Sequence, residues 1–122
     1  MTEQQPPSQR PVLTTHQWLA RSATLTVILE VLTCVSRFGL GFQSTRDTAS
    51  TIGVLTFGIR IHHGYFGLVM IVIAARLWHR SPARARYILL IAIALIASDL
   101  IHHFLVLWPI TGSPHFHFVY PN

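Results

Sequence analysis

The sequence predicts an all-α fold, a small integral membrane bundle of three transmembrane helices. Of the 122 residues, 51% are hydrophobic and only 11% are charged, and the apolar residues gather in three long stretches. A chain this short and this apolar has no room for a soluble domain beside those stretches. The expected organisation is a disordered N-terminal tail (1–17), a transmembrane domain (18–108) and a short extended C-terminal tail (109–122).

The first transmembrane helix is expected at residues 18–42. The residues before it are polar and rich in proline, which is typical of a disordered tail rather than of a secretory signal. Trp18 stands at the start of the apolar stretch, where aromatic side chains anchor a helix at the membrane interface. Cys34 lies inside this stretch, and because it is the single cysteine it excludes an intrachain disulfide.

The second helix is expected at residues 57–78. The uninterrupted apolar run from Gly64 to Trp78 is only about 15 residues long, whereas a span requires roughly 20. The helix is therefore expected to begin upstream, near Phe57, so that it reaches across the membrane.

The third helix is expected at residues 87–108. It has an aromatic residue at each end, Tyr87 and Trp108, as interfacial anchors require. Pro109 is expected to end it, because proline cannot donate the next backbone hydrogen bond.

The basic residues predict an orientation and exclude one class of partner. All nine are arginines, and the net charge is +5. They lie in connections and at helix ends rather than on a continuous basic face, which argues against nucleic-acid binding. The connection between the second and third helices holds four of them: Arg76, Arg80, Arg84 and Arg86. The positive-inside rule then predicts an inner N-terminus and an outer C-terminus. Exclusive use of arginine favours a GC-rich bacterial source, and hence the bacterial cytoplasmic membrane.

Six of the eight histidines lie at the same expected end of the helices. With a rise of about 1.5 Å per residue, His63 lies roughly 22 Å from Trp78, and His103 lies roughly 24 Å from Tyr87. Both histidines therefore share one depth, toward the outer face. Polar side chains at membrane depth are costly, so a cluster of them indicates a functional site.

Helical spacing brings candidate metal ligands onto shared faces. Asp99, His102 and His103 stand at i, i+3 and i+4, which places them on one side of a helix. Imidazoles and carboxylates are common ligands of transition-metal ions. We therefore predict a metal site of unidentified metal, with these candidate ligands: Glu30, His62, His63, Asp99, His102 and His103. A catalytic role is left open; such a site would suit oxidative or hydrolytic chemistry on an apolar substrate that the bilayer delivers.

The segment Asp99-Leu100-Ile101-His102-His103 resembles the H-x-x-H-H boxes of membrane di-iron desaturases and hydroxylases. Asp99 stands where the box has its first histidine, and the other boxes of those enzymes are not found in the chain. The resemblance covers these five residues, and it implies neither the activity of those enzymes nor membership of their family.

The C-terminal tail carries two further candidate ligands, His115 and His117. Because side chains alternate along an extended chain, these histidines are expected to face one way and Phe116 and Phe118 the other. At about 3.3 Å per residue the tail is long enough to fold back over the helical site. The imidazoles would then cover the pocket and the phenyl rings would lie in the lipid interface.

Two other interpretations stay open. In one, the protein is a tetrapyrrole-binding subunit, with His63 and His103 as axial ligands of a haem. In the other, the protein is an accessory subunit of a larger membrane complex, and its polar residues form a structural ion-pair network between helices: Glu30, Arg37, Arg60 and Asp99. Three helices enclose little interior, so under every interpretation we expect the chain to lie in the lipid bilayer as a homo-oligomer or beside partner membrane subunits.

Overall fold

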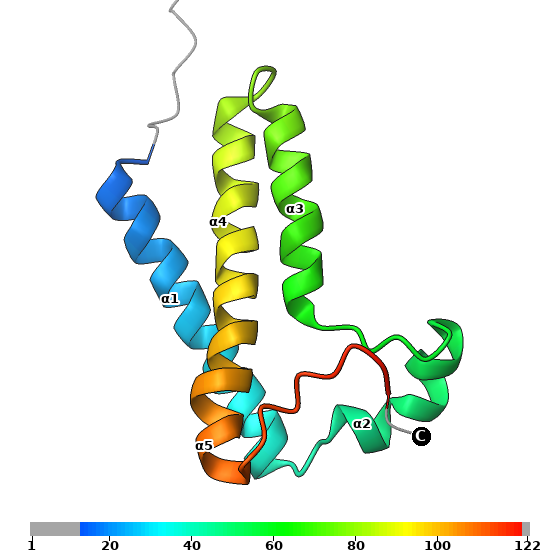
Figure 1. The fold of residues 1–122 in the computed structure, drawn as a ribbon. Helices are drawn as coiled ribbons and strands as arrows, with labels where there is room; N and C mark the ends of the chain where they lie inside the picture. The colour runs from blue at the N-terminus through cyan, green and yellow to red at the C-terminus, as the bar shows by residue number, and fades with distance from the viewer. Residues whose placement is uncertain (1–12, 121–122) are drawn as a thin grey trace, which may run out of the picture.

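The computed structural model describes residues 13–120, which form helices and irregular connections (Figure 1). Two of the helices, α1 and α4, continue without a break into π-helical segments, labelled η, and so form longer helical rods. In chain order the elements are α1 (Thr15–Cys34), η1 (Val35–Gly39), α2 (Ser44–Asp47), η2 (Ala49–Gly53), α3 (His63–Leu77), α4 (Pro82–Leu100), η3 (Ile101–Leu107) and α5 (Trp108–Thr111). The all-α prediction is confirmed for the described part of the chain, where the sole β pairing is an isolated bridge between Ile59 and Val119.

Helix α4 is the centre of the bundle. Helices α3 and α4 lie side by side and antiparallel, joined by a short connection, and α1 packs against the other side of α4 (Figure 1). No contact between α1 and α3 is found in residues 13–120. Helix α4 therefore has more buried residues than any other element, among them Ala85, Ala92, Ala94, Ser98 and Asp99.

Glycine allows α3 to approach α4 closely. A Cβ placed on Gly67 would lie 2.6 Å from the backbone oxygen of Ala92. A Cβ on Gly64, one turn earlier, would lie 2.8 Å from the Oδ2 atom of Asp99. Small residues at helix contacts are typical of membrane bundles, since they let two backbones meet.

Two helical rods are long and apolar enough to cross a membrane, by length and composition: Thr15–Gly39 and Pro82–Thr111. Helix α3 is apolar but shorter. Large apolar side chains on the outer surfaces of the helices are exposed, including Val27, Val31, Leu68 and Val72. An exposed apolar surface of this extent is the kind that lipid or another protein covers.

The first and third helices begin earlier than predicted. Helix α1 starts at Thr15 because Thr14 and Gln17 form a capping box, in which each side chain accepts a hydrogen bond from the other's backbone N–H, at 3.3 and 3.1 Å. The helix therefore takes up the last residues of the predicted N-terminal tail. Residues 1–12 lie outside the described part of the chain. Helix α4 starts with Pro82 in its first turn, where the missing N–H costs nothing.

The prediction that the second helix begins near Phe57 is wrong. Helix α3 begins at His63, and both Phe57 and Gly58 have positive φ angles, which no α-helix contains. Backbone groups just upstream bond the C-terminal tail instead: Arg60 N–H donates to Phe118 O and Tyr120 N–H donates to Gly58 O, both at 2.9 Å. Tertiary pairing with the tail therefore replaces the two predicted helical turns.

The prediction that Pro109 ends the third helix is also wrong. The rod continues through α5 and ends at Gly112, whose φ of 76° is the left-handed conformation that glycine adopts readily. Pro109 is the second residue of α5, just beyond η3, whose π-helical bonding already departs from the i to i−4 pairing that a proline interrupts. The predicted C-terminal tail is correspondingly shorter.

Candidate metal centre

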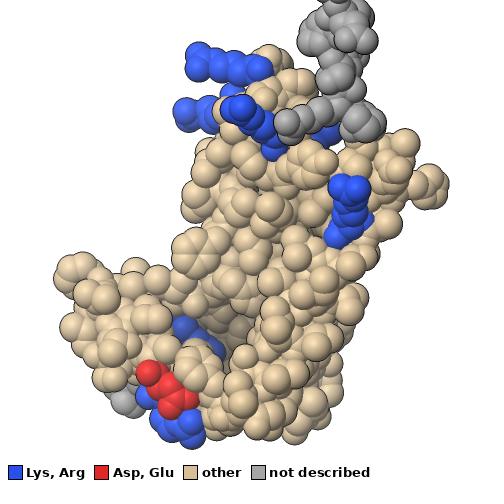
Figure 2. Space-filling view, turned by 180° about the vertical axis from the view of Figure 1, so that it is seen from behind, with Lys and Arg blue, Asp and Glu red and all other residues tan. Residues whose placement is uncertain are grey.

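A cavity of about 470 Å³ lies where α1, η3 and the connection before α3 meet. Figure 2 shows the molecule hollowed on one face, with basic atoms inside the hollow. The walls combine apolar side chains of α1 and α4 with most of the predicted ligands. The polar groups that line it are Arg37, Arg60, His62, His63, Asp99, His102, His103 and His115, among others.

The carboxylate of Asp99 is surrounded by imidazoles. Its Oδ1 atom lies 3.4 Å from His63 Nδ1, 3.6 Å from His62 Nδ1 and 3.8 Å from His103 Nε2. These separations exceed the 2.7–3.2 Å of a typical hydrogen bond. Accordingly, Oδ1 is buried without a hydrogen-bond partner among the described residues. The ligand atoms of His62, Asp99 and His103 all lie within 4.8 Å of one another, so the predicted convergence of these groups is confirmed.

Backbone carbonyls of the tail fix the tautomer that two of these imidazoles adopt when neutral. His62 Nε2 lies 3.1 Å from His117 O, and His103 Nδ1 lies 2.7 Å from Pro114 O. A carbonyl oxygen only accepts, so each of these nitrogens carries the proton and donates. In the neutral imidazole the other nitrogen is then bare, and in both residues that bare nitrogen faces Asp99.

Residues of α3 and of the tail enclose the Asp99 cluster. Gly64 leaves room for the Asp99 carboxylate, because a Cβ there would meet Oδ2 at 2.8 Å. The ring of Phe116 covers the histidines, with its centroid 4.5 Å from that of His62 and 5.1 Å from that of His103. His63 is the more exposed imidazole, and its Nε2 atom is buried without a partner in the described residues. The cluster is thus enclosed by a glycine on α3 and an aromatic ring from the tail.

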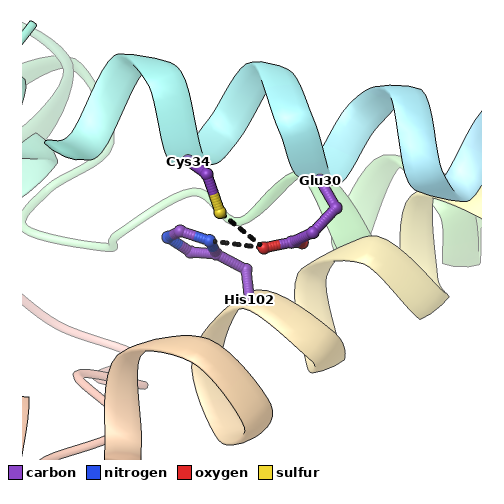
Figure 3. Close-up of side chains that lie close together, drawn as sticks. All are labelled: Glu30, Cys34 and His102. Atoms are coloured by element: carbon purple, nitrogen blue, oxygen red, sulfur yellow. Dashed lines mark hydrogen bonds and ion pairs between the residues drawn. The ribbon is translucent and has the colours of Figure 1, made fainter. Parts of the chain in front are cut away.

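A second group joins α1 to η3. Figure 3 shows Glu30 and Cys34 on α1 pointing toward His102 on the neighbouring helix. His102 Nδ1 donates to Glu30 Oε1 at 3.0 Å, and the Cys34 thiol donates to the same oxygen at 3.2 Å. Ser98 Oγ lies 3.5 Å from Glu30 Oε2. The three ligand atoms of Glu30, Cys34 and His102 also lie close enough to hold an ion, but here the carboxylate already has hydrogen-bond donors.

Both adjacent histidines of the third helix lie at the beginning of η3. Neighbouring residues of an α-helix already point about 100° apart. At the start of η3, His102 accordingly points toward α1 and Glu30 while His103 lies beside His62 of the connection. Their ring centroids are 5.6 Å apart, and the planes are nearly perpendicular, at 83°. Single π-helical turns occur frequently at functional sites. One helix therefore supplies both clusters.

The tail folds over the site with the predicted pairing of its side chains, but Phe116 covers the site in place of the histidines. The rings of His115 and His117 lie 6.4 Å apart and those of Phe116 and Phe118 lie 5.7 Å apart, as expected for residues that share a side of an extended chain. Phe116 packs inward on the imidazoles, whereas His117 is exposed and contributes its backbone oxygen. His115 lines the cavity and His117 does not, so only one of the two predicted tail ligands reaches it.

The structure brings together most of the predicted ligands, but in two groups instead of one. In the first group, His62, His63 and His103 surround the carboxylate of Asp99. In the second group, His102 bonds Glu30. Sequence reasoning did not assign Cys34 as a candidate ligand, although it lies four residues from Glu30 and hence on the same helical face. It also did not find the two tail carbonyls, because backbone oxygens leave no signal in a sequence.

Comparison with known proteins adds no assignment. No family model, no curated protein and no solved structure matches the chain. The resemblance to the H-x-x-H-H boxes accordingly remains confined to its five residues, and the conclusions below come from the geometry alone.

Proposed function

We propose that this protein is a metal-binding integral membrane protein whose site is formed by His62, Asp99 and His103, with His63 beside them. The observation that supports the proposal best is the unsatisfied Oδ1 atom of Asp99, which faces Nδ1 of His62 and Nε2 of His103. When these imidazoles are neutral, both nitrogens carry lone pairs toward the carboxylate, and a cation between them turns each lone pair into a ligand. Metal-ligating histidines characteristically donate their other N–H to a carbonyl or carboxylate, as His62 and His103 do.

The distances fit a coordinated ion better than a hydrogen-bonded network. Two donors bound at about 2.1 Å to one tetrahedral ion lie about 3.4 Å apart. The separations of 3.6 and 3.8 Å between Asp99 Oδ1 and the bare nitrogens are near this value and beyond hydrogen-bonding range. A small contraction of the side chains would complete the coordination.

The donor set points to the chemistry. Two imidazoles and one carboxylate form the set that zinc hydrolases and non-haem iron oxygenases use, with positions left open for water or substrate. The cavity adjoins this set, and its walls include apolar residues such as Leu29, Leu95 and Leu107. We therefore propose oxidative or hydrolytic chemistry on a largely apolar molecule as the activity to test.

The geometry gives no support to the haem interpretation. His63 and His103 would have to face each other across a macrocycle, yet their nitrogens both lie within 4 Å of the same Asp99 oxygen. A carboxylate between the two proposed axial ligands occupies the position of the iron.

We further propose that α3 is a third membrane span. It packs antiparallel along α4, and its outward face is apolar, with Leu68, Val69 and Val72 exposed. A helix packed along a spanning helix shares its membrane depth. The arginine-rich connection between α3 and α4 would then lie in the bacterial cytoplasm, with the N-terminus inside and the metal site near the outer face. Reporter fusions after Tyr120 and within the α3–α4 connection test this: an outer C-terminus and an inner connection are expected, and the reverse would contradict the topology.

Metal content tests the central proposal. The purified protein in detergent should retain close to one transition-metal ion per chain after dialysis, measured by inductively coupled plasma mass spectrometry. His62→Ala and His103→Ala should each lose most of it, because each removes one of three ligands. His79→Ala is the matched control, since His79 is exposed at the opposite end of α3. Equal metal content in all four proteins, or none in the wild type, would refute the proposal.

The Glu30 group favours a second candidate function, that of an accessory subunit whose polar residues are structural. Both oxygens of Glu30 have hydrogen-bond donors, so this group ties α1 to α4 and η3 without needing an ion. Under this candidate, the exposed apolar face of α1 contacts a second copy or a partner membrane subunit. Copurification of a stoichiometric partner, together with the absence of metal, would favour it over the metal centre.

A further inference from the structure

The cavity has a second polar region that the metal proposal does not use. Arg60 lies in the connection before α3 and is only 7% exposed, which is rare for an arginine. Its guanidinium donates to His115 O and to Ser44 Oγ, and both acceptors are neutral. No carboxylate of residues 13–120 lies within ion-pairing distance of it. A buried cation normally has a counter-charge, because desolvating an unpaired ion is costly.

The acidic residues near the cavity are already committed elsewhere. Asp99 faces three imidazoles and Glu30 bonds His102, whereas Asp47 pairs with Arg46 at 2.7 Å on the surface. Burial lowers the pKa of the Arg60 guanidinium, and the interactions with Tyr120 and Asp99 offset part of that shift. The cavity therefore holds a positive charge that forms no ion pair with a carboxylate of the described residues.

Arg37 adds a second positive charge to the same cavity. It lies on η1 and lines the wall together with Arg60 and His115. Burial and the charges of the two arginines also lower the pKa of His115, so this part of the cavity is electropositive. Two like charges in one hollow repel each other, and an anion between them would relieve that repulsion. The guanidinium fork matches the oxygens of phosphate and carboxylate groups.

The remaining walls suit the apolar part of a ligand. Leu29, Leu32, Ile61 and Leu107 line the cavity beside the charged end. Its volume of about 470 Å³ is within the range of small-molecule sites. Charged and apolar walls together fit a molecule with one anionic end and one hydrocarbon end, which is the composition of an anionic lipid headgroup and the start of its chain.

From this arrangement we infer that Arg37 and Arg60 bind the oxyanion of an amphiphilic ligand in the cavity, next to the Asp99 cluster. The anion site does not depend on the metal, because its cations are carried by different residues. If both sites are occupied, the anionic end is held by the arginines and the adjoining part of the ligand lies toward His62 and His103. The ligand class would then be an anionic, lipid-like molecule.

Binding of three probes tests the inference. The wild-type protein, treated with a chelator and held in a neutral detergent, is titrated by calorimetry with dihexanoyl phosphatidic acid, inorganic phosphate and dihexanoyl phosphatidylcholine. Phosphatidic acid should bind, phosphatidylcholine should bind much more weakly, and Arg60→Gln or Arg37→Gln should weaken phosphatidic acid binding about tenfold or more, as expected for a lost charged hydrogen bond. Arg84→Gln is the matched control, because Arg84 is exposed at the far end of the molecule.

Each outcome decides the inference. Inorganic phosphate binding as tightly as phosphatidic acid, with the same dependence on the arginines, would support an oxyanion site that takes a free anion. Equal binding of phosphatidylcholine, unchanged affinity in both arginine variants, or no binding of either phosphate probe would overturn it. Should Arg60→Gln fail to fold, Arg37→Gln decides, since Arg37 is half-buried and makes no hydrogen bond within the described residues. Metal content should stay at the wild-type level in Arg37→Gln. Failure of the anion site can therefore be distinguished from failure of the metal site.

Discussion

The two carboxylates of the polar layer are in opposite situations. Glu30 has a side chain 15% exposed, and its oxygens accept from His102, Cys34 and Ser98. Asp99 is more buried, at 5%, yet its Oδ1 atom has no hydrogen-bond partner among the described residues although three imidazole nitrogens lie within 4 Å. Stability alone would favour the reverse, because an unsatisfied polar group costs more the deeper it is buried. The comparison indicates that the Glu30 group holds helices together and the Asp99 group binds a ligand.

The largest expected difference between the two groups is in metal affinity. Asp99→Asn keeps the shape of the side chain but replaces an anionic ligand with a neutral amide, and should weaken metal binding by more than the roughly 10- to 100-fold typical of outer-shell changes. Glu30→Gln should leave metal binding unchanged. Competition with a chelator of known affinity measures both. Equal losses in the two variants would mean that the clusters form one site.

Two glycines one turn apart sharpen the comparison. Gly64→Ala would push a methyl group onto the Asp99 carboxylate, so metal affinity should fall, whereas Gly67→Ala would meet the backbone of Ala92 and should lower thermal stability without a direct effect on the site. Overpacking of this kind costs about 1–3 kcal/mol, and better helix propensity offsets roughly 1 kcal/mol of it. Metal content and the unfolding temperature in detergent, measured on both variants, distinguish the two effects. If Gly67→Ala loses metal and Gly64→Ala does not, Asp99 is not part of the metal site.

The structural role of the Glu30 group predicts a loss of stability without a loss of metal. Glu30→Ala removes an acceptor shared by His102 and Cys34, and should lower the free energy of unfolding by about 1–3 kcal/mol. Cys34→Ala should cost less, since a thiol is a weak donor. Unfolding in detergent measures both, with Thr24→Ala on the exposed side of α1 as control. If Glu30→Ala is as stable as the control, the group does not stabilise the bundle.

The smallest effect concerns pH. Burial, and then the charges of Arg37, His117 and Arg60, lower the pKa of His115 below its ordinary 6.5. The unfolded chain therefore binds a proton at higher pH than the folded protein, and stability should fall as the pH drops through about 6.5. His115→Gln should show a shallower decline of unfolding temperature between pH 7.5 and 5. An identical decline in the wild type and the variant would place the His115 imidazole in solvent.

The sequence predicted the presence of the helices better than the residues at which they begin and end. Apolar length and aromatic anchors located the three apolar helices, because those signals are local. The start of α3 was misplaced because Gly58 and Arg60 pair with the tail, and that long-range backbone pairing leaves no periodic pattern. Pro109 was misjudged because the π-helical η3 before it is not visible in residue spacing. The crossing of the membrane by α3 stays a prediction.

The site was predicted in its residues but not in its grouping. Depth and spacing placed Asp99 beside the histidines correctly, since helical geometry follows from sequence separation. The same spacing put His102 and His103 on one face, whereas two adjacent residues of a helix point about 100° apart, and in the bundle they meet different carboxylates. Arg60 was expected in an ion-pair network, and its neutral partners are contributed by segments whose positions depend on the tertiary fold.

X-ray absorption spectroscopy at the edge of the bound metal is the most direct test of the central claim that the ion is held by Asp99 and its imidazoles. A metal on His62, Asp99 and His103 should show only nitrogen and oxygen neighbours, at about 2.0–2.2 Å, with the multiple scattering of two imidazole rings. A sulfur neighbour at about 2.3 Å would assign the ion to Cys34, and thus to the Glu30 group, and would contradict the account. A spectrum with nitrogen and oxygen neighbours alone, including the scattering of two imidazole rings, is the result the account predicts.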